Sequence, residues 1–492
     1  MPRFSFTSLA YHALFFAFIS LVLSVSLVSG AASTPSIPVI EADPGLEESE
    51  LQKETKSIAL RGDDERLRPD SQYQTMIGNT LLTLTGSVSL DFNFQDNLNL
   101  DSMRERDRFR WNPELDFNAI VTFPRGFYLF TEFSLQDSLT FRDHDKPMNE
   151  FELQVDEFFF QAPLPLPMPS ALRIGRQQFF EPRRWVLSDT LDGIRFFLDP
   201  QPWHLRFSIS TPVMSPDNND GIRTFDDIDT SRKQIDGLFQ TIFDIPPFKQ
   251  KSKAGFYILV REDTSVKDED PIWVGLRTFG RPKFNFRVSQ NEYVKQLFKP
   301  RIKYWADAAF VAGTVRSRKI RGFGVDVGAS YIARKLPYWP YVTLSYAYGS
   351  GDSTPKKGTD SNFRQTGFHE NSGKFGGVVN FDYYGILFDP ELSNMHILTA
   401  GIGFRPLPQT SVDVVYHHYA QASRADDLRA IDVGGDLNGI HKDLGDEIDI
   451  VLGSRQIRNI RLRWRNGFFF PGSAFIQQDS AFETRFDIQI GF

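Results

Sequence analysis

The stretch FETRFDIQIGF, residues 482–492, alternates between apolar and polar side chains with a period of two. Successive side chains of an extended strand point to opposite faces, so this stretch is predicted to be a strand with one apolar and one polar face. The apolar face carries Phe486, Ile488, Ile490 and Phe492, and the polar face carries Arg485, Asp487 and Gln489. Such a strand needs an apolar surrounding on one side along its whole length.

The same alternation begins near residue 79 and recurs to the end of the chain. In LTLTGSVSLDFNF, residues 82–94, Leu, Val and Phe share one parity, and Thr, Ser, Asp and Asn share the other. We count about eighteen such runs of roughly ten residues, the length that a tilted strand needs to cross a membrane. The sequence therefore predicts an all-β fold, a transmembrane antiparallel up-and-down β-barrel of about 18 strands.

The connections between these runs fall into two kinds. Some are short and rich in proline, such as FPRGF at 123–127, and others are long and rich in charge, Gly and Asp, such as 349–375. Short turns at one rim and long loops at the other are typical of outer-membrane barrels, whereas sandwiches and propellers have no reason to sort their loops. Aromatic residues near the ends of runs are expected in a girdle at the membrane interface; they include Trp203, Tyr338 and Tyr341.

Composition excludes several classes of function. A mean hydropathy of −0.32 excludes a polytopic helical membrane protein, and a net charge of −7 gives no electrostatic reason to bind nucleic acid. The chain has no cysteine, so it forms no disulfide and no thiolate metal site. We predict neither a metal nor a cofactor.

The first residues predict export. The positive charge of MPR, the apolar run 12–28 and the small residues of VSGAAS are typical of a secretory signal peptide, which we assign to 1–31. Residues 32–75 form a polar segment expected in the periplasm, and 76–492 form the barrel. We expect a monomer in the Gram-negative outer membrane, surrounded by outer-membrane lipid.

Charged side chains are expected to line the lumen. In RNIRLRWRN, residues 458–466, Arg461, Arg463 and Arg465 alternate with apolar residues. An arginine facing lipid near the midplane costs about 2–4 kcal/mol, so these arginines are predicted to point inward. The same reasoning places Arg173 and Arg195 in the lumen. Acidic residues share this parity, so ion pairing within the lumen and contact with a substrate both stay open.

The sequence shows no catalytic constellation. His417 and His418 are adjacent and therefore lie on opposite faces of a strand, so they cannot bind one metal ion together. No G-x-S-x-G nucleophile elbow is present. We predict that the protein is not an enzyme.

Several segments resemble the alginate-export porin family of bacterial outer membranes. They include LRIGRQQFFEPRRWVLSDTLDGIRFF at 172–197, FRQTGFHENSGKFGG at 363–377 and RLRWRNGFFFPGSAF at 461–475. The resemblance implies an eighteen-stranded monomeric barrel that exports an anionic polysaccharide passively through an arginine-rich constriction. The terminal Phe492 also resembles the signal that the outer-membrane assembly machinery recognises.

The resemblance also implies roles for individual residues. Arg463, Asp189 and Glu157 match pore-lining positions of the family, whereas Asp156 and Gln178 stand where pore arginines would align. Tyr383 replaces another basic position, so this lumen carries less positive charge than the family pattern. The long periplasmic turn that precedes the strand of Arg463 in the family is here only GSRQIRN.

We therefore predict an outer-membrane porin that gives passive passage to an anionic or hydrophilic polysaccharide, as in alginate export. Arg173, Arg195, Arg463 and Arg465 would attract carboxylates, while Asp189 and Glu157 would order these arginines or separate neighbouring sugar units. Arg364 and Lys374, in the long loop, would recruit the substrate or gate the pore. The alternatives are a general, oligosaccharide or small-anion diffusion porin, an outer-membrane or secreted enzyme acting on polysaccharide or lipid, and a structural barrel plugged by 32–75.

Overall fold

The computed structural model describes residues 73–103, 106–142, 149–181, 183–200, 203–211, 234–244, 252–263, 268–281, 301–316, 318–354 and 358–492. The predicted signal peptide and nearly all of the predicted segment 32–75 lie outside these residues. Among the described residues, no helix is long and apolar enough to cross a membrane.

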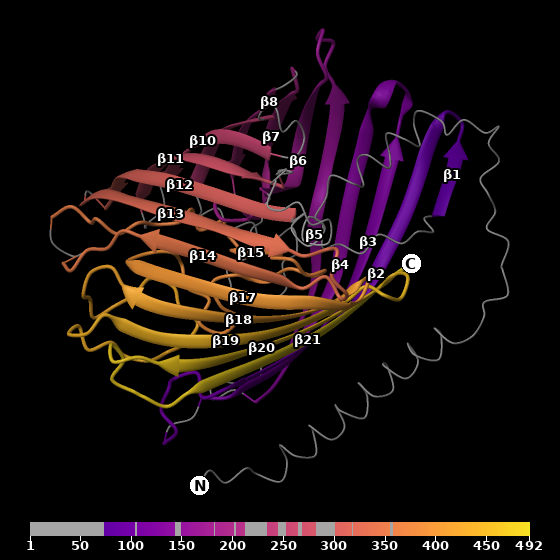
Figure 1. Cartoon of the computed structure of the whole chain (residues 1–492). Helices are drawn as coiled ribbons and strands as arrows, with labels where there is room; N and C mark the ends of the chain where they lie inside the picture. The colour runs from indigo at the N-terminus through magenta and orange to yellow at the C-terminus, as the bar shows by residue number, and fades with distance from the viewer. Residues whose placement is uncertain are drawn as a thin grey trace, which may run out of the picture. The chain divides into compact units, whose positions relative to one another are not determined.

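Eighteen of the described strands form one closed antiparallel barrel, as the alternation predicted (Figure 1). Each strand pairs with the next along the chain, and β21 pairs with β2 to close the ring. The barrel strands are β2 (Thr80–Asp96), β3 (Arg108–Thr122), β4 (Tyr128–Arg142), β5 (Asn149–Pro163), β6 (Ser170–Phe180), β7 (Ser188–Leu198), β8 (Trp203–Thr211), β9 (Gln234–Asp244), β10 (Ser252–Asp263), β11 (Glu269–Gly280), β12 (Arg301–Val315), β13 (Arg318–Ile332), β14 (Tyr341–Gly349), β17 (Met395–Leu407), β18 (Thr410–Gln421), β19 (Asp443–Ser454), β20 (Ile460–Pro471) and β21 (Ala481–Gly491).

The closing strand β21 has the two faces that its sequence predicts. Ile490 is 45% exposed on the outer face, whereas Asp487 is buried on the inner face. At the seam, Phe492 exchanges main-chain hydrogen bonds of 2.8 and 2.9 Å with Gly86 of β2. The Phe492 ring lies over Gly86, where any Cβ atom would be 2.6 Å from a ring carbon. The seam therefore depends on a glycine at position 86.

A short strand, β1 (Tyr73–Ile77), lies beside the seam. Along one edge of β2, β21 pairs with residues 87–96 and β1 pairs with residues 80–84. Closing a tilted barrel staggers the strand ends, so β2 extends beyond β21. β1 covers the part of the β2 edge that β21 leaves open, which removes an exposed row of backbone donors and acceptors.

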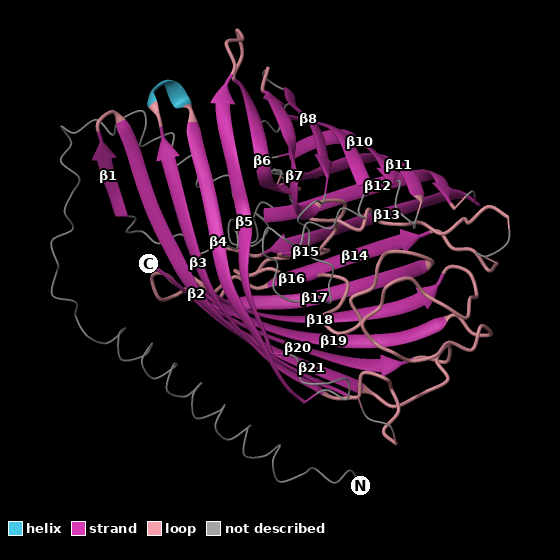
Figure 2. Cartoon of the chain, turned by 180° about the vertical axis from the view of Figure 1, so that it is seen from behind, coloured by secondary structure: helices cyan, strands magenta, loops and turns pink. Residues whose placement is uncertain are grey.

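The connections are sorted largely as predicted. One end of the barrel, the short-turn rim, carries tight turns such as 408–409 and the 3-10 turn η1 (Pro124–Gly126), which Figure 2 shows between β3 and β4. The other end, the long-loop rim, carries 97–107, 350–394 and 422–442. Three connections depart from this rule. Those after β10 and β12 are short although they lie at the long-loop rim, and the one between β11 and β12 is long although it lies at the short-turn rim.

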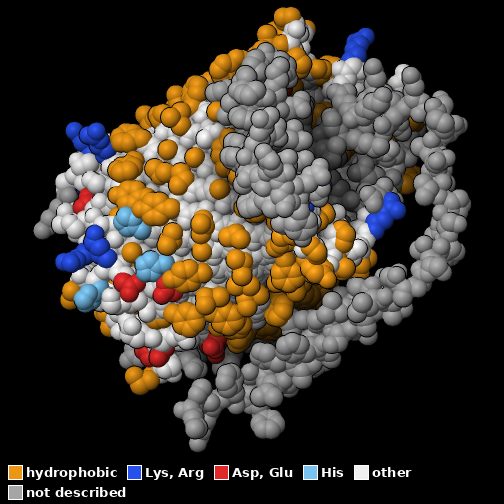
Figure 3. Space-filling view, viewed as in Figure 1, with side chains coloured by type: hydrophobic (Ala, Val, Ile, Leu, Met, Phe, Trp, Pro, Cys, Tyr) orange, Lys and Arg blue, Asp and Glu red, His pale blue; other side chains and the backbone are white. Residues whose placement is uncertain are grey.

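The outer face of the barrel is apolar. Figure 3 shows hydrophobic side chains spread over the wall, with acidic and histidine side chains toward the end that carries the long loops and basic side chains at both ends. Trp203 and Tyr338 are exposed near strand ends, as expected for girdle residues. Tyr341 was wrongly expected in the girdle: it is buried in the lumen, where its hydroxyl donates to Asp413. Tyr341 and the exposed Val342 are neighbours in one strand, so their side chains point to opposite faces and that of Tyr341 points inward.

The largest buried cluster of the described residues lies inside the barrel. The described residues of the connection between β14 and β17, 350–354 and 358–394, are here called the lumen insert. They leave the long-loop rim after β14 and turn inward, forming the small hairpin β15 (Ser372–Gly373) and β16 (Phe381–Asp382) (Figure 2). Phe375 stacks on Trp305 of the wall with ring centroids 5.9 Å apart, and Phe388 stacks on Phe469 at 4.9 Å. From its sequence we expected this segment to be a charged outer loop. Its burial inside the barrel corrects that expectation.

Candidate functional site

A cavity of about 440 Å³ lies between the lumen insert and the barrel wall. The wall contributes three arginines from the adjacent strands β20 and β21. The insert and the loop before β19 contribute all the remaining residues, four of which carry carboxylates. The lining residues are His369, Glu370, Asn371, Ser372, Asp382, Asp389, Glu391, Ala430, Arg463, Arg465 and Arg485.

The three wall arginines are already paired with carboxylates. Arg465 and Arg485 face each other across β20 and β21, an arrangement that like charges alone would disfavour. Arg465 Nη1 lies 3.2 Å from Asp382 Oδ2 of the insert, and Arg485 Nη2 lies 3.6 Å from Glu483 Oε1. Arg463 Nε donates to Asp487 Oδ2 at 2.8 Å. The Arg485 side chain is 33% exposed, so it is the most accessible of the three.

The acidic side of the cavity is only partly compensated. Glu370 pairs with Arg184, and Glu391 Oε2 accepts from Arg429 Nε at 3.1 Å. Asp389 has no hydrogen bond or ion pair within the part of the chain that the structure describes. Burial, together with the nearby charges of Asp382 and Asp432, raises the pKa of Asp389 well above its usual value. A cationic group entering the cavity would therefore find an unpaired carboxyl group.

His369 lines the same cavity. Its Nδ1 atom is buried without a hydrogen-bond partner among the described residues. Burial lowers the pKa of His369, so the imidazole is neutral near neutral pH. It adds a polar group to the lining but no charge.

A second group of arginines lies on β6, β7 and β8. Arg173 and Arg195 are direct cross-strand partners, and Arg206 follows on the next strand. Their guanidinium carbons lie 5.2, 5.1 and 4.9 Å from the centroid of the Phe197 ring. Arg173 also donates to Gln161, and Arg206 donates to Asp199 Oδ1 at 2.8 Å. The structure thus brings the two predicted arginines together and adds Arg206 to them.

Glu157 is linked to this group through the main chain of Gln178. The Gln178 N–H donates to Glu157 Oε2 at 3.0 Å, and the Gln178 carbonyl accepts from Arg195 Nη1 at 3.0 Å. The Gln178 side chain shares the parity of Arg176, which pairs with the outward-facing Phe158. Gln178 therefore meets the arginine group with its backbone and not with its side chain.

A β-bulge explains how Asp156 and Glu157 both reach the lumen. Glu132 pairs with Glu157 and Phe133 pairs with Val155, so Asp156 is an extra residue in β5. Asp156 lies close enough to Glu114 of β3 for their charges to interact. Asp189 faces the lumen opposite Phe179, and its Oδ1 atom accepts the N–H of Thr190 at 2.7 Å.

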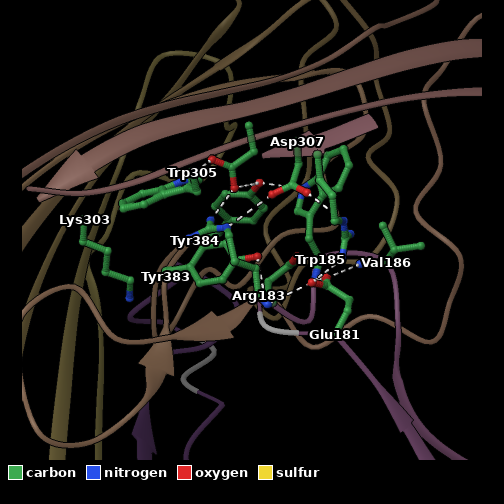
Figure 4. A network of polar contacts seen from close by, with 12 residues as sticks. Glu181, Arg183, Trp185, Val186, Lys303, Trp305, Asp307, Tyr383 and Tyr384 are labelled. Carbon is green, nitrogen blue, oxygen red and sulfur yellow. Dashed lines mark hydrogen bonds and ion pairs between the residues drawn. The ribbon is translucent and has the colours of Figure 1, made fainter. Parts of the chain in front are cut away.

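A buried charged network attaches the lumen insert to the wall (Figure 4). Arg183, in the connection between β6 and β7, lies between two wall carboxylates. Its Nη2 atom is 2.5 Å from Asp326 Oδ2, and its Nε atom is 3.6 Å from Asp307 Oδ2. Its guanidinium also stacks between Trp305 of the wall and Tyr383 of the insert, at 4.3 and 4.2 Å from the ring centroids.

Further hydrogen bonds extend this network. The Tyr384 hydroxyl donates to Asp326 Oδ2 at 3.0 Å and accepts from Trp185 Nε1 at 2.8 Å. Glu181 accepts from Arg277 Nη1 at 2.7 Å. The connection between β6 and β7 therefore fastens the insert to β11, β12 and β13.

Arg364 and Lys374 both belong to the lumen insert, inside the barrel. The Arg364 side chain is buried and pairs with Asp360. Its main-chain carbonyl accepts a hydrogen bond of 2.8 Å from Trp273 Nε1. The carbonyl of Lys374 accepts from the ammonium of Lys303 on β12. Both residues help to hold the insert against the wall.

Sequence reasoning missed Arg183, Asp382 and Asp389. One signal was available, since residues 363–388 contain five Phe and two Tyr, an aromatic content unusual for a solvated loop. A polar loop does not need so many rings unless it packs against a wall. That signal would have placed the insert in the lumen but not its partners.

The adjacent histidines lie on opposite faces, as predicted. His417 is buried, with Nδ1 2.9 Å from Thr399 Oγ1 and Nε2 3.2 Å from Asp449 Oδ2, whereas the His418 side chain is 43% exposed. Across the described ranges, no group of three or more His, Cys, Asp or Glu side chains is arranged to hold a metal ion.

The chain belongs to the alginate export family, whose pattern it matches over residues 61–488. It is also similar to the alginate production protein AlgE of Pseudomonas aeruginosa, with 25% identity over 235 residues. That match covers 41% of this chain and 44% of AlgE, so it spans less than half of that protein.

Solved structures share the fold. The crystal structure of Pseudomonas aeruginosa OccK9 (OpdG) gives a TM-score of 0.55 at 10% identity, covering 84% of this chain and 98% of that one. That of Pseudomonas aeruginosa OccK5 (OpdH) gives 0.54 at 11% identity, covering 84% and 98%. The family is that of alginate export, and these solved structures share the barrel fold of the chain.

Proposed function

We propose that this protein is an outer-membrane channel through which an acidic or hydrophilic polysaccharide, alginate or a related glycan, leaves the cell passively. One observation supports the proposal most directly. A closed barrel with an apolar outer face encloses a polar cavity with guanidinium groups on its wall. Such groups attract carboxylates, while their existing ion pairs keep the attraction weak enough for a polymer to move on.

The same proposal covers location and partners. The apolar band of the wall fits a surrounding of outer-membrane lipid, with the signal peptide directing export and the assembly machinery recognising the strand that ends at Phe492. The chain would act as a monomer, because the barrel closes on itself and encloses its own cavity. We also propose that it catalyses no reaction, in keeping with its family and fold.

The test is conductance of the purified full chain in planar lipid bilayers, with polymannuronate added to one side. We expect polymannuronate to block the current reversibly. Arg485→Gln should raise the concentration for half-maximal block about tenfold, because one exposed guanidinium is lost while its hydrogen-bonding capacity is partly kept. Arg424→Gln, an exposed loop arginine outside the cavity, is the matched control. A cation-selective pore indifferent to polymannuronate and other glycans would contradict the proposal.

A further inference from the structure

The charge balance of the cavity favours a polymer that carries both charges over a simple polyanion. Three arginines face four carboxylates there, and each arginine is already paired with an acid on the wall or the insert. A filter selective for a uniform polyanion should instead present unpaired cations, since every paired guanidinium must exchange its partner before it binds a new carboxylate.

Within this cavity it is an acidic group, not an arginine, that lacks a partner in the part of the chain that the structure describes. Asp389 faces the cavity with no hydrogen bond or ion pair among the described residues. The charged groups that act on it are three further acids, Asp382, Asp432 and Glu447, besides Arg485. Repulsion between these acids would fall if an ammonium group came between them. The backbone at Asp389 lies in the left-handed region, at φ 31°, so the surrounding structure fixes this uncommon conformation.

Carboxylate-binding groups lie within the same cavity. Arg485 is one-third exposed on the wall, and Asp389 belongs to the insert on the other side. A cavity of about 440 Å³ is large enough for a few sugar units rather than one ion. A ligand that fills it therefore meets a cation on one side and an unpaired acid on the other.

Resting on the proposed function, we propose that the cargo of this channel is a mixed-charge polysaccharide, in which uronate carboxylates alternate with free amino groups. Its carboxylates exchange with those paired to Arg485, and its ammonium groups bind Asp389. Because each uronate carboxylate would only replace the ion pair that Arg485 already makes, the chain slides without a deep energy minimum.

The experiment compares three probes of equal length on the full-length channel in planar bilayers at neutral pH. They are oligomannuronate, an oligosaccharide of alternating glucuronate and N-acetylglucosamine, and the same oligosaccharide after N-deacetylation. The last two differ only in the free amine. We expect the deacetylated probe to block at a concentration about tenfold lower than either of the others, the effect of about one additional ion pair.

Two variants locate the effect. Asp389→Asn removes the unpaired charge with little change of shape and should abolish the preference for the deacetylated probe. Asp427→Asn, in an exposed loop, should keep it. Equal block by the acetylated and deacetylated probes, or strongest block by oligomannuronate, would overturn the mixed-charge cargo and leave a polysaccharide channel standing. Failure of all three probes to block would refute the polysaccharide channel itself.

Discussion

Replacing Arg183 with alanine is expected to release the lumen insert from the barrel wall. The Arg183 guanidinium neutralises Asp326 and Asp307 and stacks against Trp305 and Tyr383. Removing one partner of a buried ion pair costs about 3–5 kcal/mol, because the remaining charge stays buried without compensation. Since about 1.4 kcal/mol changes an equilibrium tenfold, the ratio of docked to released insert should fall at least about a hundredfold.

Single-channel conductance measures this release. The insert occupies part of the lumen, so Arg183→Ala should give a larger and more variable conductance than the parent. The barrel wall should stay folded, because its strand pairing does not involve Arg183. Far-UV circular dichroism checks that point, and Arg424→Ala, an exposed arginine outside the network, is the matched control.

A second variant tests whether the effect comes from the lost attraction of Arg183 or from the uncompensated charge that remains on Asp326. Combining Arg183→Ala with Asp326→Asn removes the unpaired carboxylate from the wall. The new amide oxygen can still accept from Trp305 Nε1, and the amide NH2 group takes the place of the oxygen that faces the Tyr384 hydroxyl. The double variant should therefore recover part of the parental conductance. A folded Arg183→Ala channel with the parental conductance would refute the view that this network holds the insert in place.

Three further predictions concern the cavity, the insert and the seam. The pKa of Asp389 is raised above its usual value, so lowering the pH protonates it earlier than an ordinary carboxyl group and removes a negative charge from the cavity; reversal potentials should show anion selectivity rising as the pH falls, and Asp389→Asn should flatten that change. Glu447 accepts the N–H groups of Leu387 and Phe388 at 2.8 and 3.0 Å, so Glu447→Gln should speed hydrogen exchange at both amides; unchanged exchange would contradict this role. Gly86→Val would place side-chain atoms in the Phe492 ring and should lower the yield of folded barrel on urea dilution into lipid, while the channels that do form keep the parental conductance.

The wall of the barrel could be predicted almost strand for strand from the sequence. Alternation is a local property, because a side chain either meets the apolar outside or the polar inside and its neighbour does the opposite. The faces of Ile490 and Asp487 followed from parity alone, as did the inward direction of Arg463 and Arg465. The analogy with aromatic girdle residues failed for Tyr341. It is aromatic and lies near a strand end, but its position in the alternation directs its side chain into the lumen.

The contents of the lumen could not be predicted in the same way. Parity says that a side chain points inward, but it does not say how deep it lies or which residue across the lumen it meets. Arg183 and its partner Asp326 are 143 positions apart, and no periodic pattern connects them. The bulge at Asp156 likewise depends on the pairing of β4 with β5. The sequence by itself determined the barrel and its faces, because the choice between lipid and water is made residue by residue. Only the tertiary structure decided that the lumen insert packs inside the barrel and that the cavity arginines are already paired, because most of those contacts join residues that are far apart in the sequence.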